Sequence, residues 1–96
     1  MTTTAPIRTL HVGISWSGAP KISELEPVFN NAIDWIRYAP NCWVIRTTED
    51  ADQWYERIRH YMTVSDKLLI VQLDLGSQDK YSGWLEEWMW PRVLNR

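Results

Sequence analysis

Apolar and polar residues alternate between Ile7 and Trp16, which predicts a β-strand with one covered face. His11 belongs to the set of residues that points to the opposite face. The turn-forming residues Ser17-Gly18-Ala19-Pro20 then end this strand. The apolar set consists of Leu10, Val12, Ile14 and Trp16.

Helical spacing of Leu25, Phe29 and Ala32 predicts a short first helix that ends near Ile33. Two starting points fit the sequence. The segment Ser23-Glu24-Leu25-Glu26 matches a capping box, in which the serine accepts from the backbone and the glutamate reaches back. Alternatively, Pro27 occupies the first helical position and Glu26 is the cap.

The next residues either extend this helix through Tyr38 or form a β-hairpin. We favour the hairpin, with strands over 34–39 and 42–47, because Pro40-Asn41 suits a tight turn and the second segment is rich in strand formers. A two-residue loop pairs opposing residues as follows: Tyr38 with Trp43, Ile36 with Ile45, Asp34 with Thr47, Arg37 with Val44 and Trp35 with Arg46.

A second helix follows, with Thr48 as its cap, acidic residues in its first turn and an apolar stripe that includes Trp54 and Ile58. The segment 67–75 contains Leu68-Leu69-Ile70-Val71, a composition typical of a central strand. Tyr81, Trp84, Leu85 and Trp88 lie at helical spacing and predict an amphipathic C-terminal helix over 80–90, which Pro91 ends or kinks.

The predicted order of elements is strand, helix, strand, strand, helix, strand and a final helix. Right-handed crossovers then give an α+β fold, the ferredoxin-like βαββαβ sandwich with an extra C-terminal helix. The chain of 96 residues is expected to form a single domain over 7–96, preceded by a disordered tail over 1–6.

Composition narrows the classes of function. The formal net charge of -2 and the pI near 5.6 disfavour nucleic acid as a partner, although a local basic face is compatible with them. The 7 Trp are too many for one small core to hide, which favours a protein partner or a homo-oligomer. A single cysteine, Cys42, and the lack of a signal peptide or membrane-spanning segment favour a cytoplasmic protein with no membrane partner.

Several segments together resemble the small bacterial SinR-like family, which is related to the CRISPR-associated spacer-acquisition proteins. They are Asn41-Cys42-Trp43-Val44-Ile45-Arg46-Thr47, Ala51, Asp66-Lys67-Leu68-Leu69-Ile70-Val71 and Gly83-Trp84-Leu85. The resemblance implies a ferredoxin-like fold and a homodimer. The nuclease relatives carry an aspartate at the end of the first strand, where this chain has Ile14-Ser15-Trp16-Ser17 without a carboxylate. We therefore expect no enzyme activity.

The candidate interaction surface combines two segments. Trp35, Arg37, Val44 and Arg46, with His11, are predicted to lie on the sheet face opposite the helices. That face suits either base stacking in a nucleic-acid module or a cation–π pair of Trp35 and Arg46 that the tail or a second subunit covers. Tyr81, Trp84 and Trp88 of the tail either bind a partner or fold back on the sheet.

The sequence gives no motif for a metal ion or cofactor. Asp34, Asp66 and Asp74 show no metal-ligand spacing with His11 or His60. We therefore predict a non-enzymatic interaction or assembly protein, most simply a homodimer, with no cofactor. The alternatives are a module that binds single-stranded nucleic acid through Trp35, Arg37 and Arg46, and a degenerate nuclease.

Overall fold

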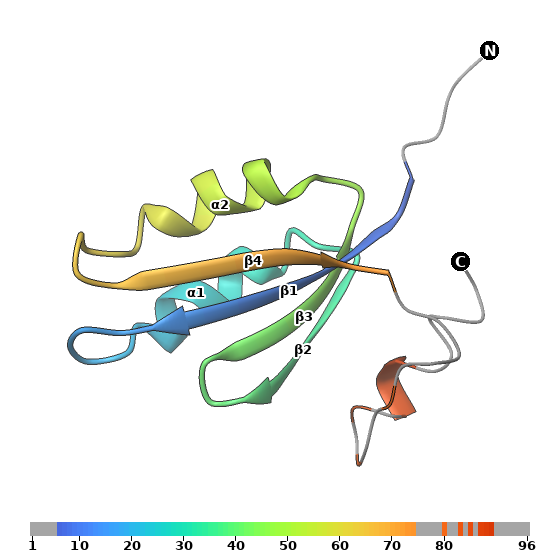
Figure 1. The fold of residues 1–96 in the computed structure, drawn as a ribbon, viewed down its shortest axis with the longest axis horizontal. Helices are drawn as coiled ribbons and strands as arrows, with labels where there is room; N and C mark the ends of the chain where they lie inside the picture. Colours follow the sequence, from blue (N-terminus) through green and yellow to red (C-terminus); the bar gives the residue numbers. More distant parts are fainter. Residues whose placement is uncertain (1–5, 75–79, 81–82, 84, 86, 90–96) are drawn as a thin grey trace.

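The structure, a computed structural model, describes residues 6–74, 80, 83, 85 and 87–89. The four strands form one antiparallel sheet in the order β2-β3-β1-β4, so the predicted α+β class is confirmed (Figure 1). Residues 85 and 87–89 also have helical backbone. The elements follow the chain as β1 (Arg8–Ser15), α1 (Ile22–Phe29), β2 (Asp34–Ala39), β3 (Cys42–Thr47), α2 (Ala51–Arg59) and β4 (Lys67–Leu73).

The main hydrophobic core lies between the sheet and the two helices α1 and α2. Phe29 of α1 is at its centre, with its ring centroid 5.1 Å from that of Trp43 and 6.1 Å from that of Trp54. Aromatic rings at such separations combine a large buried area with favourable ring contacts. The alternation predicted for the first strand is correct, and the buried members of this core are Leu10, Val12, Ile14, Leu25, Val28, Phe29, Trp43, Ile45, Trp54 and Ile58.

The hairpin turn at Pro40-Asn41 is confirmed, because β2 and β3 pair on either side of it. The predicted register is wrong by one residue. Trp35 lies opposite Ile45, and Arg37 lies opposite Trp43. The register shifts between Arg37 and Ala39, and this irregularity adds Tyr38 to β2 without a residue opposite it. A one-residue shift moves a side chain to the other face of the sheet, so it decides which residues share a surface.

Both predicted helix caps are wrong. Helix α1 begins at Ile22 after Lys21, whose side chain makes no capping hydrogen bond, and Pro27 lies inside the helix. Helix α2 begins after Asp50 and not after Thr48. Asp50 accepts a hydrogen bond from the Gln53 backbone N–H, and the Gln53 side chain accepts one from the Asp50 backbone N–H, both at 2.9 Å. This reciprocal capping box satisfies two N–H groups that the first turn leaves without helical partners.

The second face of the sheet carries a smaller cluster that the C-terminal segment covers. Met89 is only 2% exposed, and it packs with Val44 of β3. The partly buried side chains around these two residues are Ile36, Tyr38, Leu73, Leu85 and Trp88. The described residues of the tail therefore fold back on their own sheet, on the face away from α1 and α2 (Figure 1). Tyr81 and Trp84 lie outside the described residues.

Candidate protein-interaction surface

Trp35 and Arg37 lie on the helix-covered face of the sheet, contrary to the prediction. Trp35 packs against Phe29, with ring centroids 5.8 Å apart, and donates its indole N–H to Asn30 Oδ1 at 3.0 Å. Arg37 donates two hydrogen bonds to the Pro40 carbonyl, at 2.7 and 2.9 Å. The unpaired Tyr38 is the physical reason, because the register it produces turns Trp35 and Arg37 toward the helices and Ile36 toward the other face.

Val44 lies on the opposite face, as predicted, and Arg46, two residues further along β3, shares that face with it. Val44 is only 3% exposed because the C-terminal segment covers it. Trp88 is half-buried in the same cluster. The predicted group of four residues is thus divided between two faces. Trp35 and Arg46 do not form a cross-strand pair, and the arginines placed over indole rings in the described residues are Arg37 at Trp43 and Arg57 at Trp54.

A small polar cluster lies on the tail-covered face. His11 Nε2 and the Tyr38 hydroxyl form a hydrogen bond, and Tyr38 also interacts with the thiol of Cys42. Burial lowers the pKa of His11 because it disfavours the charged imidazolium. Burial also raises the pKa of Tyr38, and the hydrogen bond with Cys42 adds to this effect. No sequence pattern predicted this cluster, because it depends on the irregular placement of Tyr38 in β2.

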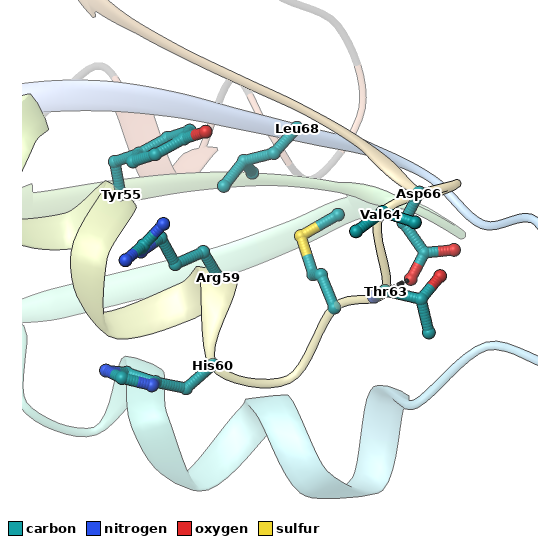
Figure 2. Close-up of a pocket in the computed structure, with 8 residues that line it drawn as sticks. Tyr55, Arg59, His60, Thr63, Val64, Asp66 and Leu68 are labelled. Atoms are coloured by element: carbon teal, nitrogen blue, oxygen red, sulfur yellow. Dashed lines mark hydrogen bonds between the residues drawn. The ribbon is translucent and has the colours of Figure 1, made fainter.

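A cavity of about 420 Å³ lies between α2, the loop after it and β4 (Figure 2). Tyr55 and Leu68 approach each other at one side of it, and Arg59 projects beside them. Its lining residues are Tyr55, Arg59, His60, Met62, Thr63, Val64, Asp66 and Leu68. Leu68 is the lining residue that comes from β4, and most of the other lining residues carry polar or charged groups.

Asp66 fixes the loop at the edge of this cavity. Its carboxylate accepts hydrogen bonds from the backbone N–H groups of Ser17 at 2.7 Å and of Thr63 at 2.8 Å. The Ser17 hydroxyl donates a further bond at 2.8 Å. These donors lower the pKa of Asp66 to about 2, since they favour the charged carboxylate. Asp66 therefore ties the β1–α1 loop to the turn before β4.

Exposed apolar side chains gather around β4 and α2. Leu69 and Val71 are 58% and 39% exposed, and both point to the face away from the helices. Tyr55 of α2 is 45% exposed on the other side of the same edge. The sequence suggested a strand buried on both faces, but β4 is the outer strand of the sheet formed by the described residues, and several of its side chains are exposed. A cluster of exposed apolar side chains is typical of an interaction site.

The other outer strand, β2, differs from β4 in three respects. It carries Asp34 and Arg37, its register is irregular before Ala39, and a proline follows it. Charges, irregular pairing and proline are the devices that discourage another strand from pairing with an edge. By contrast, β4 pairs with β1 without a register shift and has no charged residue after Lys67. The two edges of the sheet are therefore unequal, and β4 is the accessible one.

Among the described residues, no group of three or more His, Cys, Asp or Glu side chains is arranged to hold a metal ion. Within the same residues, no helix has the length and apolar character needed to cross a membrane.

No protein-family model matches the chain, and no curated protein or solved structure is significantly similar to it.

Proposed function

We propose that this chain is a non-enzymatic interaction protein that assembles as a homodimer. The observation that carries the proposal is the concentration of exposed apolar side chains around the outer strand β4, namely Leu69 and Val71 of β4 and Tyr55 of the neighbouring α2. A chain of 96 residues buries a modest share of its surface alone, so the added burial in a dimer contributes to its stability. The dimer is also what the resemblance to the SinR-like family implies.

We further propose that the fold is ferredoxin-like. The two units β1–α1–β2 and β3–α2–β4 interleave in the sheet order β2-β3-β1-β4, which is the arrangement expected of that sandwich. Both helices pack on one face, and this supports the same assignment. We also propose that the chain is related to the SinR-like family and is located in the cytoplasm. Part of the segment that resembles this family, Lys67 to Val71, lies in β4.

The alternative of binding single-stranded nucleic acid has less support. It required Trp35 and Arg37 to share an open face with Arg46, and Trp35 instead packs against Phe29 beneath the helices. The indole face of Trp35 is then not available as a platform on which bases stack. The missing carboxylate in Ile14-Ser15-Trp16-Ser17 likewise favours a protein without nuclease activity.

Sedimentation equilibrium over a range of micromolar concentrations tests the proposal. We expect a reversible transition from a monomer of 11.4 kDa to a species of twice that mass as the concentration rises. A chain that remains a monomer at the highest concentration, and that retains no protein partner in pull-down experiments, contradicts the proposal.

A further inference from the structure

We propose that two copies of this chain pair through their β4 strands, antiparallel and centred on Ile70, to form one continuous eight-stranded sheet. This inference rests on the proposed homodimer and adds the surface and the register through which it forms. The inference comes from the outer edge of β4, which no strand among the described residues covers. Leu69 and Val71 are exposed beside this edge on one face of the sheet, and Tyr55 is exposed beside it on the helix-covered face.

The backbone of β4 can accept a further strand along its outer edge. One edge of β4 pairs with β1 over seven residues, from Lys67 to Leu73, and no strand among the described residues pairs with its other edge. The N–H and C=O groups along such an edge form a template for another strand. Because β4 pairs regularly over its whole length, a second β4 can follow it without a bulge.

The side chains of β4 favour a second copy over an unrelated strand. Residues that face each other in an antiparallel pair lie on the same side of the sheet. When Ile70 faces Ile70 of the second copy, Leu69 faces Val71 of that copy, and Val71 faces Leu69. Both are exposed in the single chain. The pairing therefore covers the exposed apolar side chains of both copies with one another.

The charges at the two ends of β4 favour the antiparallel direction. Lys67 begins the strand, and Asp74 follows directly after its last residue. In the antiparallel pair centred on Ile70, Lys67 of each copy faces Leu73 of the other, and Asp74 lies across from Asp66 beyond the ends of the strand. A parallel pair in register instead places Lys67 directly beside Lys67 and Asp74 beside Asp74. Opposite charges across a strand pair are favourable, whereas like charges directly opposite each other are unfavourable.

The helix side of the edge is consistent with the same interface. Ile70 packs against the main core from β4, and the cavity beside Leu68 and Tyr55 lies on this side of the strand (Figure 2). When the β4 strand of a second copy pairs at this edge, the Ile70 side chains of the two copies lie next to each other on the helix-covered face of the joined sheet. The apolar layer between sheet and helices then continues from one copy into the other.

Lysine substitutions test the surface. Leu69→Lys and Val71→Lys should each raise the dimer dissociation constant at least about tenfold, because every substitution occurs twice in a symmetric interface. Ile33→Lys is the matched control, since Ile33 is 54% exposed and precedes β2 at the other side of the sheet. Circular dichroism and urea denaturation check that each variant is folded.

The outcomes separate this inference from the proposed function. If the unaltered chain is a dimer and both lysine variants dimerise equally well, the β4 interface is wrong and the homodimer stands. If the unaltered chain is a monomer, both proposals fail. Weakening by Leu69→Lys and Val71→Lys, without an effect of Ile33→Lys, supports the interface.

Disulfide cross-linking tests the register. In a Cys42→Ser background, Leu69→Cys combined with Val71→Cys should give a covalent dimer in oxidised glutathione, because facing residues lie about 5 Å apart between Cα atoms. Each single cysteine variant should give little covalent dimer. Efficient cross-linking of Val71→Cys alone indicates that Val71 faces its own copy and overturns the centre at Ile70. A non-covalent dimer without any cross-link overturns the pairing of β4.

Discussion

Thr47 and Trp54 form a hydrogen bond inside the core, in which the indole N–H donates to the threonine hydroxyl at 3.0 Å. Thr47 is 2% exposed and is the buried polar residue of the described chain, while Trp54 is fully buried. The same hydroxyl accepts from the Glu49 backbone N–H at 3.1 Å. The Thr47 hydroxyl at the end of β3 therefore accepts hydrogen bonds both from the buried indole N–H of Trp54 and from a backbone N–H of the segment that leads into α2.

Thr47→Val should lower the free energy of unfolding by about 1–3 kcal/mol, because it leaves the buried indole N–H of Trp54 without an acceptor. Urea denaturation monitored by tryptophan fluorescence measures the change. Thr47→Ser keeps the hydroxyl and should restore part of the loss. Equal losses for the valine and serine variants would mean that the methyl group, and not the hydrogen bond, accounts for the effect.

Asp66 should make the protein lose stability in strong acid. Its pKa is about 2 in the folded chain and 3.8 in the unfolded reference, so its contribution is complete above about pH 5 and is lost progressively as the pH falls through about 2. Asp66→Asn should remove this part of the pH dependence. Thermal unfolding from pH 2 to 6 is the measurement, with Asp52→Asn on the exposed side of α2 as the control. Identical acid profiles for Asp66→Asn and the unaltered chain would refute the role of this carboxylate.

His11 should give a second pH dependence, in a different range. Its pKa is lowered in the folded chain from the reference value of 6.5, so the unfolded chain binds a proton first as the pH falls. Stability should therefore decrease as the pH falls below about 6.5, until the folded pKa is reached. His11→Phe keeps an aromatic ring near Tyr38 and should flatten this slope. His60→Gln, at the exposed end of α2, should leave the slope unchanged, and a flat slope in the unaltered chain contradicts the prediction.

Met89 should contribute to stability through the second face of the sheet. Met89→Ala removes a side chain that is 2% exposed and contacts Val44, which predicts a loss of about 2 kcal/mol in the free energy of unfolding. Hydrogen exchange of residues 85 and 87–89 should also become faster in the variant. Glu87→Ala, at an exposed position of the same segment, is the control. If Met89→Ala unfolds at the same urea concentration as the unaltered chain, packing of this segment adds little.

Local signals in the sequence were sufficient for the elements. The alternation of Leu10, Val12 and Ile14 located the first strand, and Pro40-Asn41 located the hairpin turn. Trp54 and Ile58 identified the buried side of α2. These features depend on neighbours in the chain, because the periodicity of a strand or helix and the chemistry of a turn act over a few residues.

The candidate surface was predicted less well. Trp35 and Arg37 were assigned to the wrong face, because a register shift at one residue, Tyr38, reverses the side to which the residues before it point. Leu68 to Val71 suggested a strand buried on both sides, because an apolar run does not reveal whether neighbours cover it. The exposure of Leu69 and Val71 was therefore visible only in the assembled sheet.

The sequence by itself determined the α+β class, the order of strands and helices and the apolar residues of the core. Only the tertiary structure decided that Met89 packs over Val44, that β4 is an outer strand of the sheet, and that Leu69 is exposed there. The reason is physical. Secondary structure follows from interactions between residues close in the chain, whereas the cover of a side chain depends on segments that only folding brings together.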